Sequence, residues 1–155
     1  MTLQSWRIVK RQYSDDAFNG EGARVYGGRW NSPGAPMVYT AENASLAVLE
    51  ILVHLELTSI LSNYILFRVE FGEGAVEFIE AATLPEDWQS YPGPNSLRSI
   101  GDRWLEERRS VVLSVPSVIL PIERLFLLNP LHPDFDEIRI GEPQPFQFDS
   151  RLIKP

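Results

Sequence analysis

The hydrophobic positions along the chain predict one strong helix in its first half. Leu46, Leu49 and Val53 are spaced by three and four residues, and Asn43 stands where a helix cap is expected. We therefore predict a helix from about residue 44 to residue 56. Further apolar side chains cover most of its remaining surface, which is typical of a helix buried inside a domain.

The rest of the pattern predicts a second helix and a series of short strands. The helix is expected from Asn95 or Ser96 to about Arg108, with apolar side chains every three or four residues facing inward. Short apolar or β-branched runs between turns rich in glycine and proline are typical of strands. These runs are 5–11, 37–40, 64–71, 75–79, 110–115, 117–120, 125–128, 137–140 and 146–148, and residues 72–74 are expected to join a hairpin.

Three segments are predicted to lie outside this regular structure. Residues 19–22 are expected to form a loop, residues 23–31 a turn or a bulged strand, and residues 84–94 a surface stretch rich in proline. Strands outnumber helices and do not alternate with them regularly, so we expect an α+β fold with mixed or antiparallel sheets around a buried central helix. No repeat or linker interrupts the chain, and residues 1–155 are predicted to form a single domain.

The composition excludes several kinds of chemistry. The 155 residues are 44% hydrophobic and 23% charged, close to the average for globular proteins, so the chain can bury one core. It has no cysteine and only two histidines, which excludes disulfides and thiolate catalysis and leaves few ligands for a metal ion. We find no run of 18 apolar residues and no apolar leader, so we expect no membrane span and a cytoplasmic location.

The charge of the chain argues against a broad surface for nucleic acid. Its 21 acidic and 14 basic side chains give a net charge of −7, whereas binding to DNA or RNA requires clustered positive charge. A small basic pocket is still compatible with this balance. The basic residues are mildly enriched before residue 30, either as a solvated face or as part of a site for an anion.

Glu50 is the first candidate for chemistry. A carboxylate in the middle of an apolar helix is costly to bury unless it is paired or neutralised. Glu50 therefore forms either a structural ion pair with an arginine or the acidic group of a cleft. His54 follows four residues later on the same side of the helix, where a hydrogen-bonding partner of Glu50 is the simpler interpretation.

Two further candidates precede this helix. Arg29 follows two glycines, which let the backbone approach a ligand closely, and its guanidinium can bind a phosphate through two parallel hydrogen bonds. Tyr39 ends a short apolar strand, where an aromatic side chain belongs to the core or stacks on a planar ligand. His132 lies between two prolines and is expected to serve a turn.

Six short stretches carry a further signal through their order along the chain. They are residues 6–7, 28–31, 38–41, 46–50, 115–117 and 128–133. No single stretch is specific, but together they span most of the chain and resemble the RES domain, the toxin half of RES–Xre toxin–antitoxin pairs. The family is named for an arginine, a glutamate and a serine.

The resemblance implies a fold like that of the ADP-ribosyltransferases and an activity that cleaves the nicotinamide–ribose bond of NAD⁺, by phosphorolysis or hydrolysis. It implies that Glu50, Arg29 and Tyr39 are catalytic, and that Arg7 and Ser117 bind NAD⁺ or phosphate. Glu50 would stabilise the positive charge that develops on the ribose, and Ser117 would bond to NAD⁺ or to Glu50. NAD⁺ is then a substrate, and neither a cofactor nor a metal is expected.

Alternative functions stay open beside this one. The chain could transfer ADP-ribose to a cellular protein, or it could be an inactive module that only binds a partner. Val48 stands two residues before Glu50, where enzymes that modify protein arginines usually carry a second acid or glutamine, and this favours phosphate or water as the nucleophile. The implied partner is an Xre-type antitoxin, which would also bind the DNA, and a homodimer within that complex is compatible with the sequence.

Overall fold

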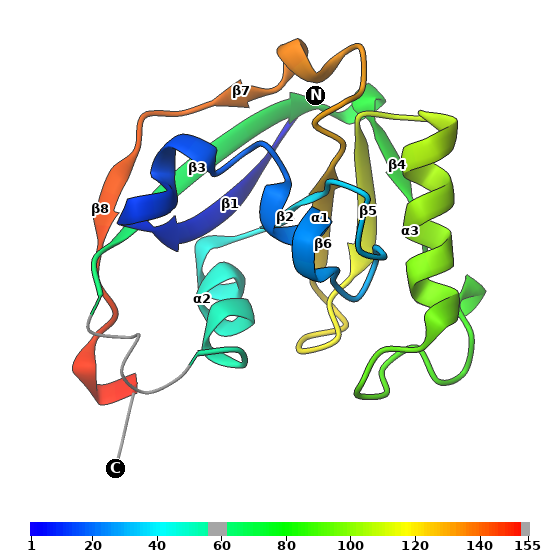
Figure 1. The fold of residues 1–155 in the computed structure, drawn as a ribbon, viewed down its shortest axis with the longest axis horizontal. Helices are drawn as coiled ribbons and strands as arrows, with labels where there is room; N and C mark the ends of the chain where they lie inside the picture. The colour runs from blue at the N-terminus through cyan, green and yellow to red at the C-terminus, as the bar shows by residue number, and fades with distance from the viewer. Residues whose placement is uncertain (56–61, 153–155) are drawn as a thin grey trace.

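The computed structural model describes residues 1–55 and 62–152, which form one curved sheet with three α-helices (Figure 1). Neighbouring strands run in the order β4-β5-β6-β2-β1-β3-β7, and β8 also pairs with β3. The strands are β1 (Thr2–Lys10), β2 (Val38–Ala41), β3 (Tyr64–Gly72), β4 (Val76–Phe78), β5 (Val112–Pro116), β6 (Arg124–Leu128), β7 (Arg139–Ile140) and β8 (Gln144–Phe146). The helices are α1 (Glu21–Tyr26), α2 (Ala44–Leu52) and α3 (Asn95–Glu107).

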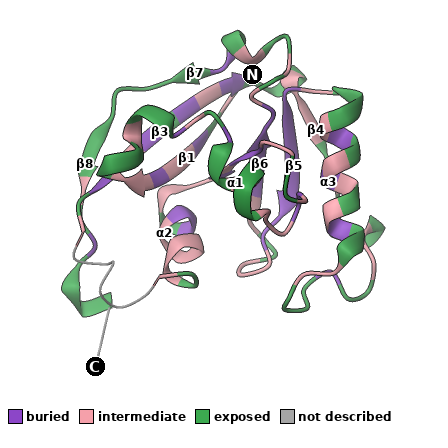
Figure 2. Ribbon diagram, viewed as in Figure 1, coloured by how far each residue is buried: buried purple, intermediate pink, exposed green. Residues whose placement is uncertain are grey.

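This architecture confirms the α+β fold with a mixed sheet. All strand pairs are antiparallel except β4 with β5, which run parallel. The central strands β5 and β6 are buried along almost their whole length (Figure 2), because both faces of the sheet are covered there. Apolar side chains on β5 and β6 therefore form the middle of the core. This explains why the sequence of each strand is apolar at nearly every position instead of alternating between apolar and polar residues.

The sheet is nearly divided between β1 and β2. These two strands share a single residue pair, Trp6 with Ala41, so the strands diverge on either side of it. Side-chain hydrogen bonds link β1 and β2 where the two strands share no backbone hydrogen bonds. The hydroxyls of Ser5 and Thr40 lie 2.7 Å apart, and Arg7 Nη1 donates to the carbonyl oxygen of Tyr39 at 2.9 Å.

Helix α2 begins as predicted but is shorter and less buried than expected. The Asn43 side chain accepts a hydrogen bond from the amide of Leu46 at 2.8 Å, which caps the helix. The helix ends at Leu52, and residue 56, the predicted end, lies outside the described residues. Leu46 and Ala47 are buried whereas Val53 is 59% exposed, because only one side of the helix packs against the sheet (Figure 2).

Helix α3 agrees with the prediction in both its bounds and its inward face. Leu97 and Trp104 are fully buried. The helix packs so closely on the loop before β2 that a Cβ on Gly101 would lie 1.7 Å from the carbonyl oxygen of Trp30. Only a glycine fits at this point, and the contact fixes α3 against the loop that carries Arg29.

The predicted hairpin between residues 64–71 and 75–79 is wrong. Both edges of β3 are occupied, by β1 on one side and by β7 and β8 on the other. The chain turns through a short 3₁₀ helix, Glu73–Ala75, and β4 pairs in parallel with β5 at the far end of the sheet. Alternation within each run located the strands but could not indicate which strand lies beside which.

Four smaller expectations also need correction. Residues 21–26 form α1, where a loop to residue 22 and then a turn or bulged strand were expected; at its start the side chain of Asn19 accepts a hydrogen bond from the amide of Glu21 at 2.9 Å. Residues 117–120 form an irregular bend instead of a strand. The late strands lie at 139–140 and 144–146, while Phe148 packs edge-on against Tyr64. The segment 84–94 is not purely surface, since Trp88 is buried.

His132 serves its turn as expected. Its Nδ1 accepts a hydrogen bond from the amide of Asp134 at 3.0 Å, and its Nε2 lies 3.2 Å from the carbonyl oxygen of Arg108, which follows α3. Both ring nitrogens are thereby used at a distance from any predicted site residue. His132 accordingly has a structural role.

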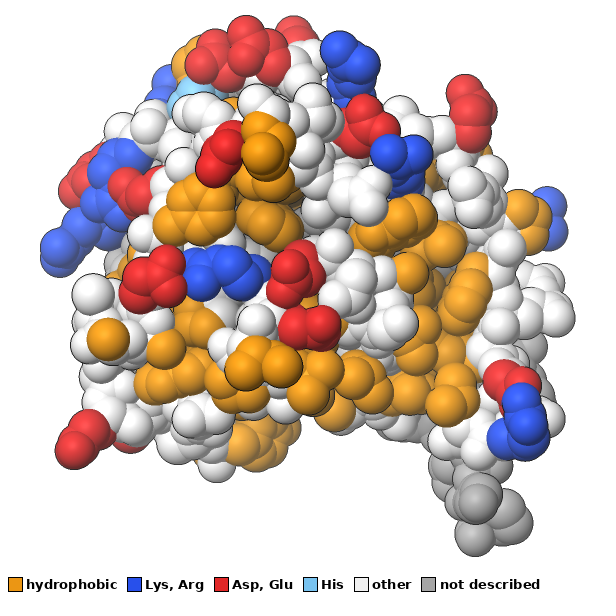
Figure 3. All heavy atoms as spheres, turned by 180° about the vertical axis from the view of Figure 1, so that it is seen from behind, with side chains coloured by type: hydrophobic (Ala, Val, Ile, Leu, Met, Phe, Trp, Pro, Cys, Tyr) orange, Lys and Arg blue, Asp and Glu red, His pale blue; other side chains and the backbone are white. Residues whose placement is uncertain are grey.

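The visible surface agrees with the prediction that the chain has no broad basic face for nucleic acid on this side. On the face seen from behind in Figure 3, basic side chains are scattered beside acidic ones, while hydrophobic side chains gather across the lower half. No helix in the described part of the chain is long and apolar enough to cross a membrane. The same residues hold no group of three or more histidine or acidic side chains placed to bind a metal ion.

Candidate active site

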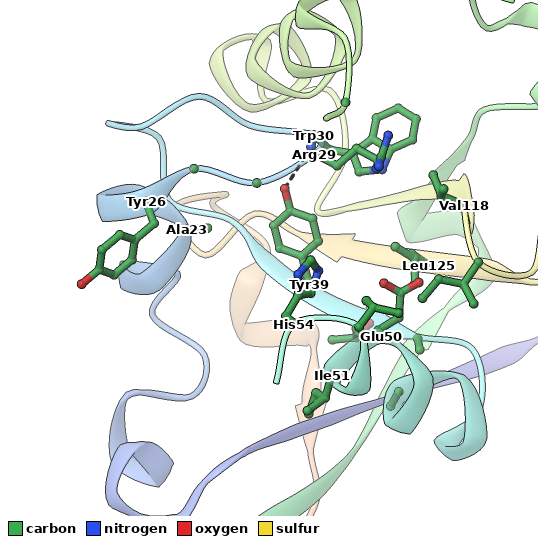
Figure 4. Close-up of a pocket in the computed structure, with 18 of the residues that line it drawn as sticks. Ala23, Tyr26, Arg29, Trp30, Tyr39, Glu50, Ile51, His54, Val118 and Leu125 are labelled. Carbon is green, nitrogen blue, oxygen red and sulfur yellow. Dashed lines mark hydrogen bonds between the residues drawn. The ribbon is translucent and has the colours of Figure 1, made fainter. Parts of the chain in front are cut away.

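A cavity of about 1120 Å³ lies beside the diverging strands β1 and β2. This volume slightly exceeds the usual range for sites that enclose small molecules, roughly 300–1,000 Å³. Its walls come from β1, β2, α2, the loop before β2 and the segment before α3. Four of the five predicted site residues line it, namely Arg7, Arg29, Tyr39 and Glu50 (Figure 4).

Glu50 projects from α2 into this cavity. In Figure 4 its carboxylate is directed toward Val118 and Leu125, away from the helix axis. Burial raises the pKa of Glu50, and the hydrogen bond from Ser117 and the positive charges of His54 and Arg29 act in the opposite direction. No ion pair to Glu50 occurs within the described residues, so of the two interpretations left open by the sequence, the structure favours the acidic group of a cleft.

Ser117 stands behind Glu50 and does not line the cavity. It is fully buried, and its hydroxyl donates to Glu50 Oε1 at 3.0 Å. The hydroxyl oxygen of Ser117 in turn accepts hydrogen bonds from the amides of Ile119 at 3.1 Å and Leu120 at 3.2 Å. Ser117 was expected to bind NAD⁺ or phosphate, or else Glu50; its geometry corresponds to the second role, because its proton and its acceptor positions are already used.

Arg29 is held by the segment before α3. Its Nη1 donates to the carbonyl oxygens of Trp88 at 3.2 Å and Ser90 at 2.8 Å. Burial lowers the pKa of Arg29, and the negative charge of Glu50 opposes this change. Since one nitrogen takes both of these bonds, the rest of the planar guanidinium is left for a ligand.

Tyr39 fixes the loop that carries Arg29. Its hydroxyl donates to Asn31 Oδ1 at 2.6 Å and accepts from the amide of Trp30 at 3.1 Å, the bond drawn in Figure 4. A Cβ on Gly28 would lie 2.5 Å from this hydroxyl oxygen, so the glycine predicted to allow close approach does so toward Tyr39. Burial raises the pKa of Tyr39, which keeps the phenol protonated and able to donate.

Arg7 lines the cavity from β1, but much of its guanidinium bonds to the backbone. Nε donates to the carbonyl oxygen of Ala17 at 2.6 Å, and Nη1 donates to that of Tyr39 at 2.9 Å across the divided sheet. Burial lowers the pKa of Arg7 to about 10, so the side chain stays protonated at neutral pH. Arg7 adds positive charge to the wall of the cavity, and no described residue forms a hydrogen bond with its Nη2.

Further residues line the cavity beside the predicted ones. His54, which is expected from the sequence only as a hydrogen-bonding partner of Glu50, lines the cavity, and its positive charge acts to lower the pKa of Glu50. Sequence reasoning missed two more lining residues of the cavity. Tyr91 lies in the segment 84–94, which was expected to be surface, and Arg98 lies in the first turn of α3. One signal was present for Arg98, because a cation in the first turn of a helix opposes the helix dipole and therefore indicates another partner.

Comparison with solved structures defines the class of the fold. The chain resembles a chain in the crystal structure of the M. tuberculosis MbcT–MbcA toxin–antitoxin complex, with a TM-score of 0.77 and 18% identity, over 95% of this chain and 85% of that chain. The two chains therefore share a fold, while the expected likeness to the ADP-ribosyltransferases stays a prediction. The RES domain model matches residues 4–149, and the chain belongs to the RES domain family.

Curated relatives cover the chain almost end to end. "Toxin Res" of Yersinia enterocolitica is 40% identical over 151 residues, which are 97% of this chain and 99% of that protein. "Prs ADP-ribosylating toxin" of Sphingobium sp. is 37% identical over an alignment of 159 positions, which covers 99% of this chain and 99% of that protein. The predicted resemblance to the RES domain is thereby confirmed over nearly the whole sequence.

Proposed function

We propose that the chain is the toxin of a toxin–antitoxin pair and that it consumes NAD⁺ by cleaving the nicotinamide–ribose bond. The observation that supports this most directly is the arrangement of Glu50. It is a partly buried carboxylate without an ion-pair partner among the described residues, and it lines the same cavity as Arg29 and Tyr39. Relatives named as toxins support the biological role.

Cleavage of the nicotinamide–ribose bond requires a negative charge beside the ribose, and Glu50 would supply it. When the bond to nicotinamide breaks, the electron pair leaves with the nicotinamide nitrogen, and positive charge develops on the ribose. The carboxylate of Glu50, oriented by Ser117, would stabilise that charge. Nicotinamide leaves as a neutral molecule, so its departure requires no proton donor.

The remaining side chains would bind the two ends of the substrate. Arg29 and Arg7 would hold phosphate oxygens, and the ring of Tyr39 would stack on the nicotinamide or ribose. Attack by water gives ADP-ribose and releases a proton, whereas attack by phosphate gives the phosphorylated ADP-ribose. Phosphate would enter as a second substrate.

An antitoxin is the partner that fits this role. The solved relative of similar fold is a toxin–antitoxin complex. We propose an Xre-type antitoxin that binds in the cytoplasm, inserts an acidic segment into the arginine-lined cavity, and supplies the binding to DNA. The net charge of −7 would itself repel DNA.

A second candidate function is transfer of ADP-ribose to a protein. The name of the Sphingobium relative, an ADP-ribosylating toxin, favours it. Val48 argues for a small nucleophile instead. This side chain packs against the core two residues before Glu50, so it offers no polar group to orient a protein acceptor.

Product analysis of NAD⁺ turnover tests these functions. Purified protein is incubated with NAD⁺, with and without phosphate, and the products are separated by chromatography. We expect free nicotinamide from the wild type, and none above background from Glu50→Gln. Glu106→Gln is the matched control, because Glu106 is exposed on α3 outside the cavity.

Three results would change the proposal. Full turnover by Glu50→Gln would remove Glu50 from the mechanism. Labelled NAD⁺ that marks a protein in a lysate, with little free ADP-ribose product, would favour the transferase. A wild-type chain that is harmless when expressed alone and leaves NAD⁺ intact would indicate an inactive binding module.

A further inference from the structure

Two arginines that line the cavity have no acidic partner within residues 1–55 and 62–152. Arg29 belongs to the loop before β2, and Arg98 to the first turn of α3. Every ion pair in this part of the chain involves other basic side chains. Arg29 and Arg98 instead donate to oxygens of one short segment, residues 88–95.

Gly93 brings the two guanidinium groups close together. Its carbonyl oxygen accepts a hydrogen bond from Arg98 Nη1 at 3.1 Å. On its other side, a Cβ at Gly93 would lie 3.0 Å from Arg29 Nη1 and 3.2 Å from Arg29 Cγ. The two arginines therefore pack around the same glycine, and Arg98 is further held by a hydrogen bond to the side chain of Asn95.

Two positive charges held this close repel each other. Burial is the main cause of the lowered pKa of Arg29, the negative charge of Glu50 opposes it, and the positive charge of Arg98 adds a smaller lowering. Arg98 also lies at the positive end of the α3 dipole, where a cation is disfavoured. Neutral carbonyl oxygens fix the positions of both groups but do not cancel their charge.

We infer that Arg98 and Arg29 together bind phosphate oxygens in this cavity, with Gly93 placed between them. Planar guanidinium groups bind phosphate through paired, charge-assisted hydrogen bonds, which is the geometry that a diphosphate requires. The ligand is either the diphosphate of the dinucleotide or a free phosphate that enters as nucleophile. The identity of the ligand rests on the proposed function, whereas the binding of an anion by Arg98 does not.

Binding of inorganic pyrophosphate, measured by calorimetry on the full chain, tests the inference without any turnover. We expect Arg98→Gln to weaken binding by about 10- to 100-fold, the loss expected for a charge-assisted hydrogen bond. Arg103→Gln is the matched control, since it removes the same charge from an exposed position on the same helix, outside the cavity. We expect less than about a twofold effect from it, because salt screens exposed charges.

Arg98→Lys provides a second variant that keeps the charge but lacks the planar fork. It should lose part of the affinity and keep the thermal unfolding temperature of the wild type. Unchanged affinity in Arg98→Gln, or equal losses in Arg98→Gln and Arg103→Gln, would overturn the inference. A wild type that binds no pyrophosphate would overturn it as well.

Kinetics separate the two sources of phosphate and the two hypotheses. A rise confined to the KM for NAD⁺ in Arg98→Gln assigns the site to the dinucleotide, and a rise confined to the KM for phosphate assigns it to the nucleophile; both support the role of Arg98. If the wild type binds pyrophosphate through Arg98 but leaves NAD⁺ intact, the proposed function fails and the inference holds. If NAD⁺ is consumed and neither KM changes, only the inference fails.

Discussion

Replacing Ser117 with alanine should destabilise the fold by more than the loss of one hydroxyl group suggests. The hydroxyl is fully buried, donates to Glu50, and accepts from two amides at 3.1 and 3.2 Å. Each buried polar group left without a partner costs roughly 1–3 kcal/mol. Ile119 and Leu120 are only partly buried, so water can reach their amides in part, and we expect a loss of about 2–4 kcal/mol in the free energy of unfolding.

Urea unfolding at neutral pH measures this loss, with Ser5→Ala as the matched control. Ser5 is also fully buried, but among the described residues its hydroxyl forms a hydrogen bond only with that of Thr40, so about 1 kcal/mol is expected. The deficit of Ser117→Ala should also depend on pH. Without the hydrogen bond from Ser117, the pKa of Glu50 in the folded protein rises further above its ordinary value. The difference in unfolding free energy between wild type and Ser117→Ala is therefore smallest at low pH, where Glu50 is protonated in both proteins. It widens as the pH rises through the raised pKa, because the variant loses more stability there than the wild type. Equal losses in both alanine variants, independent of pH, would refute this reasoning.

Three more predictions follow from the same contacts. Glu50→Gln should unfold at a higher temperature than the wild type at neutral pH, because burial disfavours the charged carboxylate; the difference should vanish below the ordinary carboxyl pKa, and calorimetry across pH would show whether it does. Gly93→Ala should raise the KM for NAD⁺ about tenfold by displacing Arg29, while Gly72→Ala, which meets open space, should not. Tyr39→Phe should lower the melting temperature, since the amide of Trp30 loses its acceptor.

Much of the fold could be predicted from the sequence because the signals are local. Asn43 caps α2, and the apolar spacing of α3 is confirmed by the burial of Leu97 and Trp104. The pairing of β4 with β5 could not be predicted, since it depends on which edges of the sheet are already occupied. The extent of burial of α2 was also misjudged, because apolar side chains on a helix are equally compatible with a core and with the wall of a cavity.

The candidate site was predicted in part for the same reason. Residue type and position suggested Glu50, Arg29 and Tyr39, and the structure places all three around one cavity. Arg98 gave only a weak signal, because its proximity to Arg29 arises from Gly93, more than sixty residues beyond Arg29 in the chain. Their catalytic and binding roles stay predictions until the variants are measured.

The two ends of the cavity are supported by different kinds of structure. Glu50 is held by a capped helix and by Ser117, which follows β5 directly, so the carboxylate is fixed by the sheet and its adjoining turn. Arg29 and Arg98 depend on carbonyl oxygens of a loop, which can adjust by small movements. A substrate held in this way would have its reacting bond placed rigidly against the acid, while the anion-binding end adapts to phosphate oxygens. Variants of the loop should therefore change mainly the KM, and variants at Glu50 mainly the kcat.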